Sequence, residues 1–95
     1  PMKKVIMIKI PGCPYCANAR KAISLLQEEE PYKDIKVEEI DETTQPDLAA
    51  PYGKDYYYVP SLFIEGKKYF EAKPGMDYDT IEKAVRDVFE EARKA

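Results

Sequence analysis

The sequence predicts an α/β domain with the element order strand, helix, strand, helix, strand, strand, helix. A β-branched apolar run in residues 3–10 is followed by apolar residues at helical spacing, which is typical of a strand that leads into a helix. Two shorter apolar runs surround Gly66, and a second helical stripe occupies the C-terminal segment. The length of 95 residues fits one domain, which we assign to residues 1–95.

The first predicted strand covers residues 3–10. Its middle is apolar on both faces, so we expect a central strand that is covered on both sides. Pro11 and Gly12 end this strand. The first helix is predicted for residues 14–29, with Pro31 beyond its end and fraying in its acidic last turn. One face of this helix carries Ala19, Ala22, Ile23 and Leu26.

The middle of the chain predicts a second strand and a short helix. Residues 34–40 alternate like an edge strand with one buried face, formed by Ile35, Val37 and Ile40. The succession of strand, helix and strand predicts a right-handed parallel crossover. Residues 46–50 are expected to form one or two turns of helix, which Pro51 ends.

The C-terminal part predicts a hairpin followed by the last helix. Residues 61–64 and 68–72 form its two strands, joined by a tight turn at residues 65–67. The last helix is expected to begin near Asp77 or Asp79, either of which suits the N-cap position. The apolar stripe of this helix consists of Ile81, Ala84, Val85, Val88, Phe89 and Ala92.

Composition and charge exclude several classes of function. The net charge of −3 argues against a nucleic-acid binder that uses a broad basic face. No stretch approaches the ~20 apolar residues that a membrane-spanning helix needs, and we expect no signal peptide. Two cysteines without an export signal are typical of the reducing cytosol, where a disulfide is transient and catalytic. We therefore expect a cytoplasmic monomer.

Cys13 and Cys16 lie where the first strand meets the first helix. Pro14 suits the first turn of a helix, because the N–H group that it lacks has no partner there. Cys13 then lies near the N-cap, where free backbone N–H groups and the helix dipole favour a thiolate. Cys16 is three residues further on and more shielded. This pair predicts thiol–disulfide exchange, with Cys13 as nucleophile and Cys16 as the resolving thiol.

Three other interpretations of the cysteine pair are weaker. A closed zinc site needs four ligands, and the chain has no third cysteine and no histidine, so only a metal-bridged dimer could complete one. A structural disulfide across two residues would constrain almost no chain. Two inert core thiols do not match a helix start that contains proline. The metal-bridged dimer and a redox-sensing module without turnover remain alternatives.

Three motifs resemble the glutaredoxin branch of the thioredoxin superfamily. Cys13-Pro14-Tyr15-Cys16 is the glutaredoxin active-site tetrad, and Val59-Pro60 resembles the segment whose cis proline faces that site. Gly75-Met76-Asp77 resembles the opening of the last helix of the family. The resemblance implies a thioredoxin-like fold of glutaredoxin type, with a four-stranded mixed sheet flanked by helices. It places the first strand inside the sheet and the first and last helices on one face.

The resemblance also implies ligands and partners. Glutathione would be the thiol co-substrate, with no bound cofactor and no metal, and the partners would be disulfide-containing or glutathionylated proteins. Pro14, Tyr15 and Pro60 would support the active site. The implied set for glutathione or substrate is Lys9, Tyr15, Tyr58, Val59, Pro60, Gly75, Met76 and Asp77.

The sequence departs from its relatives at several positions. The tryptophan that precedes the first cysteine of thioredoxins is Gly12 here, which disfavours a thioredoxin proper. Lys9 is one position further from the tetrad than the basic residue of glutaredoxins, and the family's glycine pair is replaced by residues 73–75. A thioredoxin-type reductase therefore stays an alternative electron donor to glutathione.

The tyrosines that precede Val59 have two interpretations. We expect Tyr56 and Tyr57 to cap the sheet edge with their hydroxyl groups in water. Tyr58 could do the same, or it could form a wall beside the cysteines that shapes a groove for a peptide or thiol substrate.

Overall fold

The computed structural model describes residues 2–94 and contains the predicted elements in the predicted order. Two 3₁₀ helices, η1 and η2, add to them. Among these residues, no helix is both long enough and apolar enough to cross a lipid bilayer. The bounds are β1 Val5–Lys9, α1 Pro14–Leu26, η1 Glu30–Tyr32, β2 Val37–Asp41, α2 Pro46–Ala49, η2 Ala50–Tyr52, β3 Ser61–Ile64, β4 Lys67–Glu71 and α3 Tyr78–Arg93.

The four strands form one mixed sheet in the order β2-β1-β3-β4. β1 pairs in parallel with β2 and antiparallel with β3, so that Met7 lies between Glu39 and Leu62. β3 and β4 form the antiparallel hairpin. The mixed sheet and the interior position of β1 are both confirmed.

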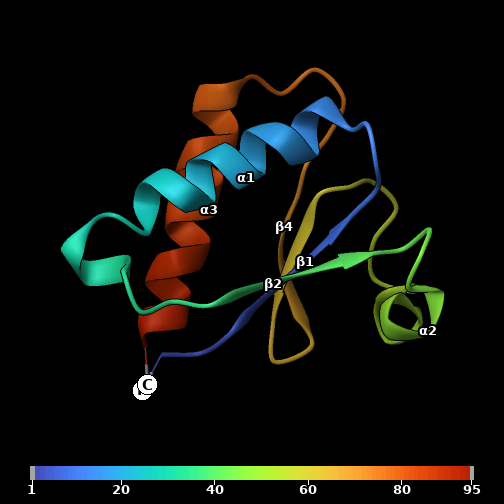
Figure 1. The fold of residues 1–95 in the computed structure, drawn as a ribbon, viewed down its shortest axis with the longest axis horizontal. Coiled ribbons are helices and arrows are strands. Elements are labelled where there is room, and N and C mark those ends of the chain that lie inside the picture. Colours follow the sequence, from blue (N-terminus) through green and yellow to red (C-terminus); the bar gives the residue numbers. More distant parts are fainter. Residues whose placement is uncertain (1, 95) are drawn as a thin grey trace.

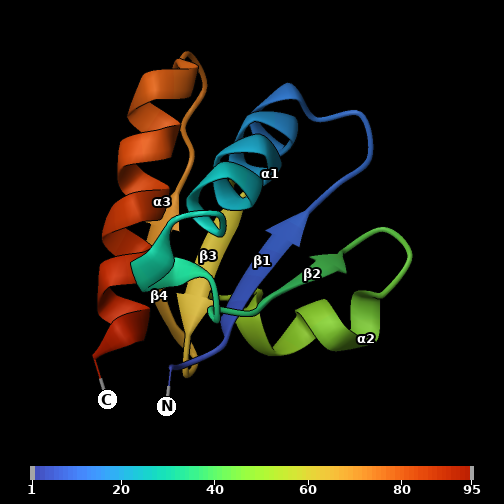
Figure 2. The ribbon, with the colours of Figure 1, turned by 60° about the vertical axis from the view of Figure 1, so that its left-hand side comes forward.

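Helices cover both faces of the sheet (Figure 1), with α1 and α3 on one side and α2 on the other. Figure 2 shows α1 and α3 side by side in front of the strands, as the resemblance implied. The side chains of β1 alternate between these two faces. Val5 and Met7 enter the core beneath α1 and α3, whereas Ile6 and Ile8 enter a smaller core beneath α2. This double burial explains the continuous apolar run of the first strand.

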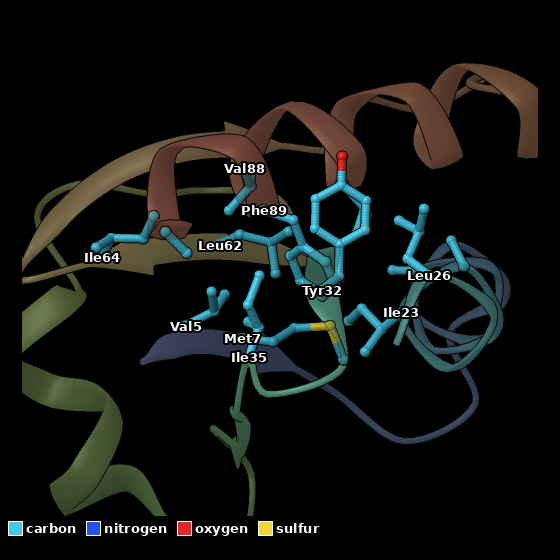
Figure 3. Close-up of a cluster of buried hydrophobic side chains, with 14 of the residues drawn as sticks. Val5, Met7, Ile23, Leu26, Tyr32, Ile35, Leu62, Ile64, Val88 and Phe89 are labelled. Atoms are coloured by element: carbon cyan, nitrogen blue, oxygen red, sulfur yellow. The ribbon is translucent and has the colours of Figure 1, made fainter. Parts of the chain in front are cut away.

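The larger core joins the sheet to both long helices (Figure 3). Met7 and Leu62 reach it from the strands, while Leu26 comes from α1 and Phe89 from α3. Tyr32 of η1 contributes its ring, which meets Phe89 edge-on at a centroid distance of 5.7 Å. These contacts fix α1 against the sheet, and with it the position of both cysteines.

Helix α1 ends three residues earlier than predicted. The chain turns after Leu26 because the Gln27 side chain donates a hydrogen bond of 2.9 Å to the carbonyl oxygen of Ile35. The acidic residues that follow lie at the negative end of the helix dipole, where they favour the end of a helix. Pro31 does not end α1, because α1 ends five residues before it and Pro31 lies in the first turn of η1.

The second strand also differs from its prediction. It begins at Val37, and Ile35 is buried before it starts. The expectation of one buried face was wrong, because Ile40 packs into the smaller core while Ile35 and Val37 contact the larger one. Residues at odd and even positions of a strand point to opposite faces, and both faces of this sheet are covered.

Helix α2 ends at Ala49, before Pro51, which confirms the predicted short helix. The chain continues from α2 into η2. Pro51 lies in the first turn of η2, where the backbone N–H group that proline lacks would have no hydrogen-bond partner in the helix. The hairpin turn consists of Glu65 and Gly66, with φ values of 51° and 80°. Two consecutive positive φ values are typical of a type I′ turn. The strand after this turn starts at Lys67, one residue before the prediction.

Asp77 rather than Asp79 caps the last helix. The Asp77 carboxylate accepts a hydrogen bond of 2.9 Å from the backbone N–H of Thr80. Of the predicted apolar stripe, Ala84 is half-buried and the others are buried. The stripe prediction is therefore confirmed in substance, and α3 begins where the glutaredoxin resemblance placed it.

Candidate active site

The Cys13 sulfur caps the N-terminus of α1. After β1, the turn at Pro11 and Gly12 brings the chain to Cys13, which has an extended backbone with φ −90° and ψ 115°. Its Sγ accepts a hydrogen bond from the backbone N–H of Cys16 at 3.1 Å. Pro14 occupies the first helical turn, as predicted. One free N–H group of the helix end thus points at the sulfur, an arrangement that stabilises negative charge there.

Cys16 is placed differently, although it is only three residues away. It is 1% exposed, while Cys13 is partly exposed, and both are free thiols. Burial, followed by the hydrogen bond with Cys13, raises the pKa of Cys16 to about 12. Cys16 therefore stays a protonated thiol near neutral pH, shielded from solvent beneath the Cys13 sulfur.

A distant segment closes the other side of Cys13. The peptide bond between Val59 and Pro60 is cis, as predicted. The Cys13 thiol lies 3.8 Å from the carbonyl oxygen of Val59, to which it donates. The structure thus brings together the tetrad and the Val59–Pro60 segment, which are 46 residues apart in the sequence.

Tyr15 joins the tetrad to the third motif. Its hydroxyl oxygen accepts a hydrogen bond of 2.8 Å from the backbone N–H of Gly75, whose φ of 92° favours glycine. Met76 is partly buried against the larger core. Asp77 is committed to its helix cap, and the hydrogen bond with Thr80 lowers the pKa of its carboxyl group. The three motifs therefore meet at one end of the sheet.

A cavity of about 540 Å³ opens beside the cysteines. All of its lining comes from residues 9–20, and Lys9 and Arg20 supply its positive charge. Both cations are paired. Lys9 lies 3.4 Å from a carboxylate oxygen of Asp41, and Arg20 donates two hydrogen bonds of 2.9 and 2.8 Å to Glu39. Arg20 was not among the residues predicted from the sequence, although its position four residues after Cys16 indicates the same helical face.

The tyrosine segment forms a second region beside Val59. Tyr57 is 83% exposed and Tyr58 is 38% exposed. The prediction for Tyr56 was wrong, because its ring packs against Phe63 and its hydroxyl group donates a hydrogen bond of 2.6 Å to Glu42. The hydroxyl group thus finds a protein partner rather than water, because the ring fills the edge of the smaller core.

A smaller cavity of about 300 Å³ lies at this segment. Its lining consists of Lys54, Asp55, Tyr56, Tyr57, Tyr58, Lys68, Glu71 and Lys73. Lys73 lies over the ring of Tyr58, 5.7 Å from its centroid. Glu71 is the second residue that the sequence analysis missed, because nothing near it in the sequence indicates what it contacts.

Comparison with known proteins gives the family. A model described as Glutaredoxin-like domain (DUF836) matches residues 4–86. The chain belongs to this glutaredoxin-like family. It is similar to a glutaredoxin of Haemophilus influenzae, at 37% identity over 68 residues, covering 66% of this chain and 75% of that protein. Glutaredoxin 1 of Salmonella typhimurium is 37% identical over 62 residues, which cover 60% of this chain and 68% of that protein.

Solved structures agree on the fold. Thioredoxin 1 from Thermosipho africanus aligns with 96% of this chain and 99% of its own, with a TM-score of 0.57 and 19% identity. Trxlp from Edwardsiella tarda aligns over 88% of this chain and 82% of its own, with a TM-score of 0.62 and 12% identity. At such identities the likeness concerns the thioredoxin-like fold alone, which confirms the predicted fold class.

The glutaredoxin-like match contains the tetrad, Val59–Pro60 and the segment that opens α3. Family and fold together support a protein of the thiol–disulfide oxidoreductase kind. Within residues 2–94, no three His, Cys, Asp or Glu side chains are grouped so that they could hold a metal ion. The residues assigned to glutathione by resemblance stay predictions.

Proposed function

We propose that this glutaredoxin-like protein catalyses thiol–disulfide exchange, with Cys13 as nucleophile and Cys16 as resolving thiol. One observation carries the proposal: the Cys13 sulfur caps α1 at the protein surface, and Cys16 is buried three residues along the same helix. The nucleophile can thus reach a substrate, whereas the second thiol can reach only the first.

The reaction has two balanced steps. The Cys13 thiolate attacks one sulfur of a substrate disulfide, and the other substrate sulfur leaves as a thiolate and takes a proton. Cys16 then loses its proton and attacks the Cys13 sulfur, which releases the first substrate sulfur. The substrate gains two electrons, and Cys13 and Cys16 form a disulfide. Two thiols of a reductant restore the pair.

Glutathione is the proposed reductant, and disulfide-containing or glutathionylated proteins are the proposed substrates. The similarity to glutaredoxins supports glutathione. The backbone edge at Val59, next to Cys13, suits an extended peptide or the tripeptide backbone of glutathione. We further propose that the protein works as a cytoplasmic monomer, because its thiols need a reducing compartment.

One observation favours an electron donor other than glutathione. Lys9, which would hold a carboxylate of glutathione, is paired with Asp41 and only 22% of its side-chain surface is exposed. Glutathione would have to compete with that carboxylate. A thioredoxin-type reductase is therefore the alternative donor.

A parallel reduction experiment tests both donors. The disulfide form of the protein is incubated with glutathione, or with a thioredoxin reductase and NADPH, and its thiols are counted over time. Turnover is then measured on a glutathionylated peptide and on a protein disulfide. Reduction by glutathione with turnover on the peptide supports the glutaredoxin role, whereas reduction by the reductase alone supports the alternative. Reduction of the protein without turnover on either substrate would support the alternative function of a redox-sensing module.

A further inference from the structure

We propose that Glu71 is a positioning residue for substrate binding: its carboxylate holds residues 57–60, the clamped segment, against Cys13. This inference rests on the proposed function and goes beyond it, because Glu71 lies outside the three motifs that carry the resemblance to glutaredoxins.

The contact is made to the backbone. The N–H groups of Tyr57 and Tyr58 both donate to Oε2 of Glu71, at 2.8 and 2.6 Å. The other oxygen, Oε1, accepts a hydrogen bond of 2.7 Å from the Lys68 ammonium group. Only 9% of the Glu71 side-chain surface is exposed. A shielded carboxylate with three donors is a fixed part of the structure rather than a mobile surface charge.

The end of β4 holds both ends of the clamped segment. Glu71 binds the N–H groups at its start, and the N–H of the next residue, Ala72, donates to the carbonyl oxygen of Pro60 at 3.0 Å. Between them, the Ser61 hydroxyl donates to the carbonyl oxygen of Tyr58 at 2.7 Å. The carbonyl oxygen of Val59 is left facing the Cys13 thiol.

A carboxylate suits this task because the clamped segment lies outside the strands. Its N–H groups have no sheet partners and need acceptors from elsewhere. Burial raises the pKa of Glu71, but the Lys68 ammonium and the N–H groups of Tyr58 and Tyr57 outweigh it and lower the pKa to about 2. The acceptor therefore stays charged at every pH at which thiol exchange proceeds.

The expected consequence concerns binding more than chemistry. An extended substrate would pair with the backbone edge at Val59, and a segment already held in place loses less freedom on binding. The Cys13 sulfur, by contrast, is held at the N-terminus of α1 by the Cys16 N–H group. Loss of the clamp should therefore raise KM for a peptide disulfide and leave kcat nearly unchanged.

Four proteins test the clamp: wild type, Glu71→Ala, Glu71→Gln and Lys68→Met. With a disulfide-bonded peptide, Glu71→Ala should raise KM roughly tenfold, since hydrogen bonds to a charged group are lost, and change kcat less than about twofold. Glu71→Gln should stay within about threefold of wild type, because its amide oxygen can accept both N–H groups. Lys68→Met removes the ion pair alone and should change KM less than about twofold.

Two further measurements separate positioning from a general loss of structure. Amide hydrogen exchange at Tyr57 and Tyr58 should accelerate at least about tenfold in Glu71→Ala and stay near wild type in Lys68→Met. Alkylation of Cys13 by iodoacetamide should be unchanged in all variants. An unchanged KM in Glu71→Ala, or a fall in kcat with slower alkylation, would overturn the inference.

The outcome for wild type keeps the two proposals apart. If wild type turns over and Glu71→Ala matches it, only the role of Glu71 fails. If wild type reduces no disulfide, the proposed function fails, and the hydrogen-exchange comparison alone decides whether Glu71 holds the clamped segment.

Discussion

Two regions approach the Cys13 sulfur, and they are built in different ways. The motif segment, residues 9–20, lines the larger cavity by itself, and its sulfur is held by an N–H group three residues away. The clamped segment, residues 57–60, depends on β4 for both of its ends. The hydrogen bond that holds the Cys13 sulfur is local to one helix start, whereas the clamped segment takes its position from hydrogen bonds to the end of the hairpin.

This difference assigns the two regions different tasks. Thiol chemistry requires a sulfur with fixed donors, and a capped helix provides them locally. Substrate binding requires a backbone edge in a defined place, and tertiary hydrogen bonds provide it here. Substitutions in the motif segment should therefore change the rate of bond exchange, while substitutions that support the clamped segment should change binding and stability.

The largest expected effect comes from the cysteines themselves. Cys13→Ser should lose activity on protein disulfides and on glutathionylated peptides by at least about a thousandfold, because the nucleophile is gone. Cys16→Ser should lose activity on protein disulfides but keep part of its deglutathionylation activity, since a second glutathione can resolve the mixed disulfide. Both variants are assayed on both substrates.

An inactive Cys16→Ser enzyme on the glutathionylated peptide would count against the role of glutathione. If wild type then reduces protein disulfides well, a thioredoxin-type reductase replaces glutathione as the proposed electron donor. Each variant also needs a far-UV circular dichroism spectrum like that of wild type, which shows that the loss lies in the chemistry.

Selective alkylation tests the contrast between the two thiols. Burial and the hydrogen bond with Cys13 raise the pKa of Cys16 to about 12, so Cys16 stays protonated at pH 7. Iodoacetamide at pH 7 should therefore modify Cys13 at least about a hundredfold faster than Cys16. Mass spectrometry of tryptic peptides measures both rates. Equal rates would contradict the division of roles.

The features that sequence reasoning predicted are those encoded by neighbouring residues. The N-cap position of Cys13 follows from Pro14 and the helical stripe behind it, and the central place of β1 follows from its apolar residues. Asp77 could be named as a candidate cap for the same reason. In each case the information lies within a few positions of the feature.

The features that could not be predicted from the sequence depend on residues that lie far apart along the chain. The end of α1 is set by a hydrogen bond from Gln27 to Ile35 across a turn. Arg20 finds Glu39 on β2, 19 residues away, and Glu71 finds backbone donors 13 and 14 residues before it. Such pairings follow from the folded topology, and one sequence does not specify which donor meets which acceptor.

The pH dependence of stability tests whether the charge of Glu71 holds the clamped segment. The carboxyl group of Glu71 has its pKa lowered from 4.5 to about 2 in the folded protein. Its contribution is therefore fully present above about pH 5 and is lost as the pH falls toward 2. Glu71→Gln removes this titration. The difference in free energy of unfolding between wild type and Glu71→Gln should shrink by about 1–3 kcal/mol between pH 5 and pH 2.

Urea unfolding at several pH values measures this difference. Glu65→Gln is a matched control, because Glu65 lies in the exposed hairpin turn and, among residues 2–94, forms an ion pair with Lys3 alone, at the surface. The difference in free energy of unfolding between wild type and Glu65→Gln should vary by less than about 0.5 kcal/mol between pH 5 and pH 2. A difference for Glu71→Gln that stays constant with pH would contradict the charged clamp.

The smallest expected effects come from two tyrosines, Tyr15 in the first turn of α1 and Tyr78 at the start of α3. The Tyr15 hydroxyl oxygen accepts the N–H group of Gly75, whereas Tyr78 Oη is buried and has no hydrogen-bond partner within residues 2–94. Removing a satisfied acceptor costs stability, but removing a buried unsatisfied hydroxyl group relieves a desolvation penalty.

Tyr15→Phe should therefore lower the free energy of unfolding by about 0.5–1 kcal/mol, and Tyr78→Phe should raise it by up to about 1 kcal/mol. Both substitutions delete a phenolic hydroxyl group, so opposite signs in urea unfolding would tie the effect to the hydrogen bond. A loss of equal size in both would mean that the hydroxyl groups act through packing instead, and that the hydrogen bond between Gly75 and Tyr15 does not stabilise the fold.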